Sequence, residues 1–326
     1  MNTALIETRD VKKFFPVKTG AFARSIPLKA VNGVSLRLDT GETLGLAGES
    51  GSGKSTLGKL LLGLLRPDEG DIHFLGKPLH SLTRDELLSF RTMVQMIFQD
   101  PYSSLNPRMQ IGDIIGEPMR IHGLSSPSRY REQVVALMER VGLAGDHFSR
   151  YPHEFSGGQR QRIGIARALA VSPRLIIADE PVSALDLSIQ AQIINLLQEL
   201  RIEFSLSFLL IAHDLSVIRH MCDRIAIMYL GAIVEMGRTV DVFNGFLHPY
   251  TEALLSAVPN VLLGARKQRI VLTGDIPSPL APPPGCPFHT RCPHARPDTC
   301  ALLVPSLEEK FPGHYAACHF STELFR

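Results

Sequence analysis

The stretch GESGSGKST, residues 48–56, constrains the fold of this chain more than any other segment. It matches the pattern G-x-x-x-x-G-K-[ST], whose backbone N–H groups converge on phosphate oxygens while glycines keep side chains out of the way. An apolar run at 43–48 precedes it, and a stretch with helical character at 55–65 follows it. A Gly-Ser linker does not stand between a strand and a helix. The sequence therefore predicts a strand, a phosphate-binding loop and a helix.

Each residue type in this loop has a use in binding a nucleotide. The ammonium of Lys54 can reach the β- and γ-phosphates, and the Ser55 hydroxyl can bind Mg²⁺. The helix that begins here adds the positive end of its dipole. We therefore expect ATP and Mg²⁺ as cofactors, with ATP held by Gly48, Glu49, Ser50, Gly51, Ser52, Gly53, Lys54, Ser55 and Thr56.

The run LIIADE at 175–180 supplies a second half for this site. Its apolar residues predict a buried strand, and Asp179 emerges at the carboxyl end, where ligands of α/β proteins bind. We expect Asp179 to hold Mg²⁺ through water, as the acidic partner of the phosphate loop, and Glu180 to act as general base for the attacking water. The same run without a phosphate loop upstream would carry little information.

Up to about residue 257 the chain alternates strands and helices, which predicts an α/β core with a mostly parallel sheet. Leu230-Gly231 stands between two apolar runs and predicts a hairpin over 224–237. Residues 16–27 are expected to form a loop inserted between two strands. Further strands are expected at 4–10, 29–39, 174–179 and 207–212, and helices at 131–143, 158–170 and 187–203.

The charge balance excludes some classes of partner. The chain has 34 basic and 32 acidic residues, a net charge of +2, which leaves no electrostatic footprint for nucleic acid. The first residues show no secretory signal, and apolar runs such as 206–212 are far shorter than the ~20 residues of a membrane span. We expect a soluble cytosolic protein with reduced thiols and no nucleic-acid partner.

The segment FSGGQRQRIGIARAL at 155–169 decides between families of P-loop proteins. Its Ser-Gly-Gly-Gln opens a helix and can present a hydroxyl and free N–H groups to a phosphate, although alone it could be a turn and helix cap. Placed between the phosphate loop and LIIADE, it resembles the signature of the ABC ATPase family, over about residues 4–257. The resemblance implies an ABC cassette with a RecA-like parallel sheet core, an antiparallel β subdomain and a helical subdomain at about 100–157.

The same resemblance implies roles for further residues. Gln99 is similar to the Q-loop glutamine that contacts the metal and the lytic water, and Asp186 lies in a D-loop, SALD. His213 resembles the switch histidine at the γ-phosphate, and Phe15 would stack on adenine unless it is an ordinary core phenylalanine. The family closes two cassettes head to tail, so that the signature of one covers the ATP of the other. The signature residues here are Ser156, Gly157, Gly158 and Gln159.

A finer resemblance is to the ATP-binding subunits of dipeptide/oligopeptide (peptide/nickel) importers, and KKFFPVKTG is similar to their F-type subunit. It is carried by 98–108, 150–169, 178–197, 228–235 and 248–259. It implies an ATPase, peripheral at the cytoplasmic face of the membrane, that energises peptide uptake. The implied partners are a paralogous ATPase subunit, two permease subunits and a solute-binding protein. Nickel, glutathione or another small solute is an alternative cargo, and a soluble non-transport ABC ATPase is a further alternative.

A different composition begins near residue 258, where prolines crowd 276–287. We therefore expect a nucleotide-binding domain at 1–257 and a small Cys-rich extension at 258–326, with the boundary at 258–275. The chain has five cysteines, and one of them, Cys222, is expected to be a small buried core residue.

The other four cysteines lie in the extension and predict a metal site. Their spacings of five, seven and seventeen intervening residues fit neither the C-x₂₋₄-C of zinc sites nor the cysteine run of bacterial ferredoxins. Spacing leaves both metals open, and His289, His294, His314 and His319 could replace a cysteine on zinc. The importer resemblance implies a structural [4Fe–4S] cluster, with Zn²⁺ as the alternative. The expected ligands are Cys286, Cys292, Cys300 and Cys318.

Overall fold

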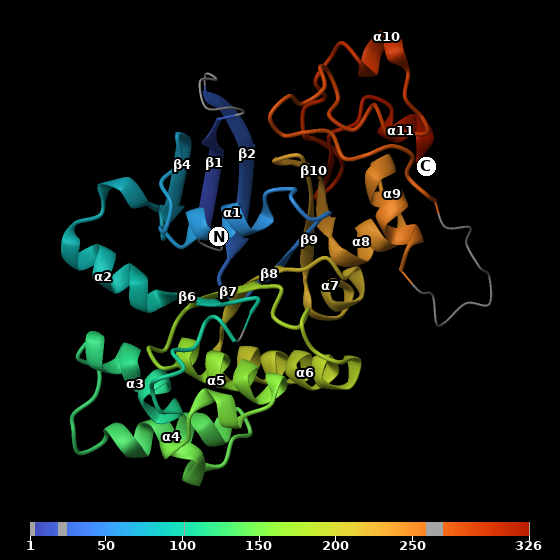
Figure 1. Cartoon of the computed structure of the whole chain (residues 1–326). Coiled ribbons are helices and arrows are strands. Elements are labelled where there is room, and N and C mark those ends of the chain that lie inside the picture. The colour runs from blue at the N-terminus through green and yellow to red at the C-terminus, as the bar shows by residue number, and fades with distance from the viewer. Residues whose placement is uncertain (1–3, 19–24, 101, 259–269, 326) are drawn as a thin grey trace. The chain divides into compact units, whose positions relative to one another are not determined.

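The computed structural model describes residues 4–18, 25–100, 102–258 and 270–325. It divides into two compact units, which we describe one at a time (Figure 1). The first unit comprises Met1–Leu5, Asp39–Glu42 and Leu75–Leu210. The second comprises Ile6–Leu38, Thr43–Phe74 and Ile211–Arg326. The expected boundary at 258–275 falls in large part on 259–269, outside the described residues.

An antiparallel sheet forms one layer of the second unit. Its strands lie in the order β2-β1-β4, with bounds β1 (Ala4–Lys18), β2 (Ser25–Asp39) and β4 (Glu69–Phe74). Strand β4 pairs with β1 from Ile6 opposite Phe74 to Lys12 opposite Glu69. The buried Thr8 hydroxyl donates to Val34 O at 3.0 Å, so that even a polar side chain inside this layer is satisfied.

The expected loop at 16–27 was wrong at both ends. Strand β1 continues to Lys18 and β2 begins at Ser25, and residues 19–24 lie outside the described part of the chain. Pro16 suggested a loop because proline cannot donate a ladder hydrogen bond. The pairing with β4 ends at Lys12, so that Pro16 lies where β1 has no need of a donor on that side.

A second sheet of this unit carries the strand that precedes the phosphate loop. Its order is β11-β12-β10-β9-β3, and β3 pairs with β9 in parallel while the other pairs are antiparallel. The predicted hairpin is confirmed, and its corner residues Leu230 and Gly231 have φ of 43° and 83°, as a two-residue hairpin turn requires. The bounds are β3 (Thr43–Ala47), β9 (Arg224–Tyr229), β10 (Ala232–Arg238), β11 (Glu308–Phe311) and β12 (His314–Ala316).

The last part of the chain therefore adds two strands, β12 and β11, to the edge of β10. Cys222 is buried, as predicted, and its Sγ lies 3.0 Å from the position that a Cβ on Gly45 would take. The helices of this unit are α1 (Lys54–Leu61), α7 (Leu215–Met221), α8 (Thr239–Asn244), α9 (Pro249–Ser256), α10 (Pro297–Cys300) and α11 (Ser321–Leu324).

The first unit contains three neighbouring strands in the order β8-β7-β6, and β6 pairs with β7 in parallel. Every residue of β7 and β8 is buried, which explains why four of the five residues in each strand are apolar. With the strands of the second unit, these elements confirm the expected α/β fold with a parallel sheet and an antiparallel subdomain. The bounds of these three strands are β6 (Val94–Ile97), β7 (Leu175–Asp179) and β8 (Ser207–Ile211), and the unit also contains the short strand β5 (Lys77–Pro78).

Helices make up the remainder of the first unit, and α3, α4 and α5 lie together in the green part of the chain (Figure 1). A Cβ on Gly112 would lie 2.5 Å from the Phe148 ring, so that glycine allows this ring to approach α3. The α-helices are α2 (Arg84–Met93), α3 (Ile111–Ile121), α4 (Tyr130–Arg140), α5 (Gly157–Leu169) and α6 (Leu187–Phe204), and short 3₁₀ turns cover Leu79–Ser81, Gly145–Ser149 and Pro152–Glu154.

Across the described ranges, no helix has both the length and the apolar character that a membrane crossing demands.

Candidate functional site

The phosphate loop turns sharply between β3 and α1. Gly48 has φ of 149°, and a Cβ there would lie 2.2 Å from Met228 O. Gly53 has φ of 104°, and a Cβ there would lie 2.1 Å from Ala30 O. Both positions exclude a side chain by conformation and by space, which is the physical reason for glycine at each end of the loop.

Neighbouring backbone holds the loop in this shape. The N–H of Gly231, in the β9–β10 corner, donates to Ser52 O at 2.9 Å. The buried Lys54 ammonium donates to Gly48 O at 2.7 Å and to Glu49 O at 2.9 Å, so that it lies against the inner side of the loop. Ser55 and Thr56 follow in the first turn of α1, where N–H groups point out of the helix end. This arrangement of amides and one ammonium can bind phosphate oxygens.

His213 lies at the same edge of the sheet as the start of this loop. The N–H of Ala212 donates to Leu46 O at 3.2 Å, and the exposed His213 follows directly. Its other neighbour, Asp214, caps α7 by accepting from Ser216 N at 2.8 Å. The structure thus places His213 beside the end of β3, inside the second unit.

Phe15 lies half-buried on β1 beside an anchored backbone. Asp68 accepts hydrogen bonds from Phe14 N at 2.6 Å and from Lys13 Nζ at 2.9 Å. Burial opposes ionisation of Asp68, but these two bonds outweigh it and hold the pKa of the carboxyl below its usual value. The Lys13 ammonium lies 5.8 Å from the centre of the Phe15 ring. This ring can offer a face to a base.

The first unit brings Gln99 and Glu180 together. Gln99 Nε2 donates to Glu180 Oε2 at 2.9 Å, and the buried Asp179 ends β7 directly before Glu180. Glu180 has φ of 46°, which is unfavourable for a residue with a side chain and costs about 1–2 kcal/mol. The backbone is held there because Glu180 O accepts from Ser183 N and from the Ser183 hydroxyl at 3.2 and 3.1 Å. Strain of this kind collects at functional sites.

The Ser-Gly-Gly-Gln segment starts α5 with a reciprocal cap. Gln159 N donates to the Ser156 hydroxyl at 3.4 Å, and Ser156 N donates to Gln159 Oε1 at 3.0 Å. A Cβ on Gly158 would lie 2.5 Å from Ile189 Cγ2, so that the glycine lets α5 lie close to α6. Asp186 is the residue before α6 and accepts from Gln190 N through its carbonyl at 2.8 Å.

The predicted site residues thus divide between the two units. The second unit holds the phosphate loop, Phe15 and His213. The first holds Gln99, Asp179, Glu180, Asp186 and the signature segment Ser156, Gly157, Gly158 and Gln159.

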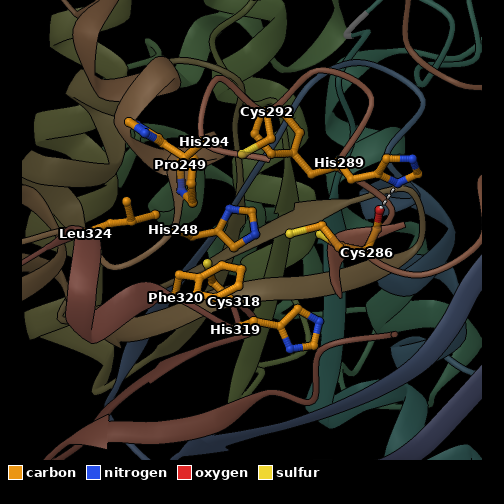
Figure 2. A pocket seen from close by; sticks show the side chains of 12 residues that line it. His248, Pro249, Cys286, His289, Cys292, His294, Cys318, His319, Phe320 and Leu324 are labelled. Atoms are coloured by element: carbon orange, nitrogen blue, oxygen red, sulfur yellow. Dashed lines mark hydrogen bonds between the residues drawn. The ribbon is translucent and has the colours of Figure 1, made fainter. Parts of the chain in front are cut away.

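The four cysteines of the extension line one pocket of the second unit. Figure 2 shows several of them around a shared space with histidine rings and Phe320. Burial raises the pKa of the Cys286 thiol to about 11 and that of Cys292 to about 12. The pocket is lined by His248, Pro249, Cys286, Phe288, His289, Cys292, His294, Cys300, Cys318, His319, Phe320 and Leu324.

The side chains of this pocket do not meet at one point. Within the described ranges, no group of three His, Cys, Asp or Glu side chains is placed to hold a metal ion, so that the structure does not support the expected metal site as such. The chemistry of the donor set is a separate matter, because iron–sulfur clusters are held by cysteine thiolates and four thiols line this one pocket.

One expected alternative ligand lies elsewhere. His314 is absent from the residues that line the pocket, and its Nε2 lies 2.8 Å from Glu235 Oε1 in a buried pair. Conversely, His248, Phe288 and Phe320 line the pocket, and no spacing in the sequence pointed to them.

Comparisons with known proteins agree with this arrangement. The family described as ABC transporter matches residues 31–183, and the Oligopeptide/dipeptide transporter, C-terminal region, matches residues 234–300. The oligopeptide transport ATP-binding protein AppF of Bacillus subtilis (strain 168) is 52% identical over 319 residues, which cover 97% of this chain and 97% of AppF. OppF of Escherichia coli (strain K12), also an oligopeptide transport ATP-binding protein, is 52% identical over 320 residues, covering 96% and 95%.

A solved structure extends the comparison to three dimensions. The ATP-binding cassette MJ0796, a dimer in a post-hydrolysis state bound to ADP and Pi, matches with a TM-score of 0.64 at 28% identity. The match covers 72% of this chain and 98% of that one, so that nearly the whole of that cassette has a counterpart here.

Proposed function

This chain belongs to the ABC transporter family, within the group of oligopeptide and dipeptide transport ATP-binding proteins, and from that premise we propose that it energises peptide uptake through separate permease subunits. It is an ABC-type ATPase. The observation that carries the proposal is identity at about half of all positions along nearly the whole chain, including the extension, to proteins named as oligopeptide transport ATP-binding proteins.

ATP would bind with its phosphates in the loop from Gly48 to Thr56. Loop amides and the N-terminus of α1 would face the phosphate oxygens, and Lys54 would exchange its carbonyl partners for the β- and γ-phosphates. Mg²⁺, when bound, would neutralise charge on the β- and γ-phosphates, and the hard oxygen donors proposed to hold it belong to Ser55, Gln99 and Asp179. Phe15 would stack on adenine.

Hydrolysis needs a water activated beside the γ-phosphate. We assign the general base to Glu180, whose carboxylate is oriented by the hydrogen bond from Gln99. His213 would hold the γ-phosphate, and Ser156, Gly157, Gly158, Gln159 and Asp186 would act at the ATP of a partner cassette closed head to tail. The rate would come from electrostatic stabilisation by positioned groups.

The proposed assembly is a heterodimer with a paralogous ATPase subunit, under two permease subunits and supplied by an extracytoplasmic solute-binding protein. The chain would be peripheral at the cytoplasmic face of the membrane. Di- or oligopeptides are the proposed cargo, with nickel, glutathione or another small solute as the alternative. The near-neutral charge gives no reason to include nucleic acid.

Purification from detergent-solubilised membranes tests this assembly. We expect a tagged chain to bring down two permeases and a second cassette, and cells with Glu180→Gln in the chromosome to lose uptake of a labelled tripeptide. Recovery of the chain with no membrane protein, together with unchanged uptake in the variant, would favour a soluble non-transport ATPase instead.

We also propose a cassette at 1–257 and an extension at 258–326 that holds a structural [4Fe–4S] cluster on Cys286, Cys292, Cys300 and Cys318. The support is the presence of all four cysteines in the lining of one pocket and the few apolar side chains of the proline-rich stretch. Anaerobic purification followed by iron and sulfide analysis and a visible spectrum tests the cluster. If the purified protein contains zinc and no labile sulfide, the metal of this site is Zn²⁺ and not an iron–sulfur cluster.

A further inference from the structure

An ion pair joins the cysteine extension directly to the phosphate loop. Arg291 Nη1 lies 2.7 Å from Glu49 Oε2, and Arg291 Nη2 lies 3.0 Å from Glu49 Oε1. Each terminal guanidinium nitrogen therefore donates to one carboxylate oxygen in a fork, a geometry that fixes direction as well as distance. Glu49 is the second residue of the loop, and Arg291 directly precedes Cys292.

The burial of this pair separates it from ordinary surface ion pairs. The Arg291 side chain is 6% exposed and that of Glu49 27%, whereas exposed pairs in water contribute little because solvent screens them. The guanidinium also lies beside Tyr229, with Nη1 3.5 Å from the phenol oxygen. Removal of either partner leaves a desolvated charge behind, so that the pair constrains both elements strongly.

Glu49 is in turn a support of the phosphate loop. Its N–H donates to the Tyr250 hydroxyl at 2.8 Å, and its carbonyl oxygen accepts from Lys54 Nζ at 2.9 Å and from Ser52 N at 3.2 Å. The side chain fixed by Arg291 thus belongs to the same residue whose backbone positions the phosphate-binding lysine. A shift of Glu49 would move the amides and the ammonium that the phosphates need.

On its other side, Arg291 belongs to the turn that carries two of the pocket cysteines. Arg291 N donates to Phe288 O at 3.0 Å, and Cys286 N donates to Cys300 O at 2.8 Å. The buried Phe288 lines the cysteine pocket and packs 5.3 Å, centre to centre, from both Tyr229 and Tyr250. Figure 2 shows Cys286, His289 and Cys292 of this turn on the pocket wall.

We propose that Arg291 is a positioning residue for the nucleotide site, through which the state of the cysteine pocket sets the affinity of the phosphate loop. The inference rests on the nucleotide site proposed above. When the pocket cysteines are ligated, the turn is ordered, Arg291 holds Glu49, and the loop is preorganised for phosphate. When they are not, the ordering of the loop must be supplied by the nucleotide, which weakens binding.

Nucleotide affinity of the full chain, measured with a fluorescent ATP analogue, tests this role. For Arg291→Met we expect the Kd to rise about tenfold, a usual size for coupling between sites, with kcat at saturating ATP within about twofold of wild type. Arg291→Lys keeps the charge but loses the forked pair of hydrogen bonds. Its Kd should therefore lie between those of the wild type and Arg291→Met. Arg9→Met is the matched control, because Arg9 makes the same kind of fork to Glu7 on the antiparallel sheet and should leave the Kd unchanged. An Arg291→Met protein with the wild-type Kd overturns the proposal.

Glu49→Gln tests the same link from the other side if Arg291→Met does not fold. It should weaken nucleotide binding, and adding Arg291→Lys to it should weaken binding no further, because the two changes remove one shared interaction. Fully additive losses in Kd overturn the proposal. So does a Cys292→Ser protein that folds, lacks metal and binds nucleotide as tightly as wild type.

Coupling between two ligands is reciprocal, which provides a readout independent of hydrolysis. ATP should slow the release of iron or zinc from wild-type protein to a chelator, and this protection should disappear in Arg291→Met. Equal protection in both proteins contradicts the role of Arg291. If the wild-type chain binds no nucleotide at all, the proposed function itself fails, whereas wild-type binding with unaltered variants refutes this inference alone.

Discussion

Gln99 Nε2 donates a 2.9 Å hydrogen bond to Glu180 Oε2, although the two residues are 81 positions apart in the chain. The amide therefore orients one carboxylate oxygen of the proposed general base. The strained backbone of Glu180, held by Ser183, aims the side chain at this partner. Gln99 and Glu180, two of the predicted catalytic residues, are thus joined by a hydrogen bond, so that changes to either side chain should alter hydrolysis.

Replacement of the base is the first prediction. Glu180→Gln keeps the size of the side chain but cannot accept a proton, so we expect the ATPase rate to fall by at least 10²-fold while ATP still binds. Steady-state phosphate release and nucleotide titration measure the two effects. Glu132→Gln, on the exposed face of α4, is the control and should be normal. Near-normal turnover of Glu180→Gln would exclude Glu180 as the base.

The partner of the base gives a second prediction. Gln99→Glu places two carboxylates at hydrogen-bond distance, and their repulsion displaces the Glu180 side chain. We expect kcat to fall further in Gln99→Glu than in Gln99→Ala, which only removes the orienting bond. Comparison of kcat at saturating ATP decides the point. Equal rates in the two variants would mean that the hydrogen bond has no part in hydrolysis.

The loop glycines give a third prediction. Gly53→Ala would bring a Cβ to 2.1 Å from Ala30 O, so that the loop must move and nucleotide binding should be lost. Gly51 has φ of 77° but no atom within 4 Å of a Cβ, so Gly51→Ala should cost only the backbone strain of about 1–2 kcal/mol. Kd and Tm of the two variants measure the contrast. A milder loss of binding in Gly53→Ala than in Gly51→Ala would contradict it.

Phe15 is the subject of a fourth prediction, which separates stacking from packing. Base stacking contributes about 1–3 kcal/mol, so Phe15→Leu should raise the Kd for ATP roughly tenfold with little change in Tm, while Phe15→Tyr keeps affinity. A fall in Tm with unchanged Kd would make Phe15 a core residue.

Because hydrogen bonds lower the pKa of Asp68, its anchoring of Phe14 should be fully present above about pH 4 and lost only as the pH falls further.

The pair of His314 and Glu235 gives a fifth prediction, about stability. Glu235 is fully buried, and its Oε1 accepts from Leu247 N at 2.7 Å and lies 2.8 Å from His314 Nε2. His314→Leu removes the imidazole that partners this buried acid, leaves it the Leu247 N–H, and should destabilise the second unit by about 3–5 kcal/mol. Thermal unfolding measures this loss, and the double variant His314→Leu/Glu235→Met should recover stability because the unpaired buried acid is then removed as well. A single variant as stable as wild type would show that the pair does not hold β12 to β10.

The sequence predicted what depends on local chemistry. The phosphate loop needs glycines where φ is positive and where backbone passes within contact distance, and the pattern of 48–56 states this directly. The hairpin at Leu230-Gly231 and the cap at Ser156 follow from the same short-range rules. The long strand β1 escaped prediction because Pro16 suggests a break, and only the end of the β4 register at Lys12 shows why it is tolerated.

Contacts between distant segments were decided by the tertiary structure alone. The cysteine spacings left the metal open, and the gathering of all four thiols on one pocket depends on how α9, α10 and α11 pack around them. Arg291 and Glu49 are 242 positions apart, and no sequence motif that contains one of them predicts contact with the other. Short motifs encode the groups that bind phosphate because those groups act through adjacent backbone. The ion pair that links this loop to the cysteine pocket depends on the burial of Arg291, which only the packed chain creates.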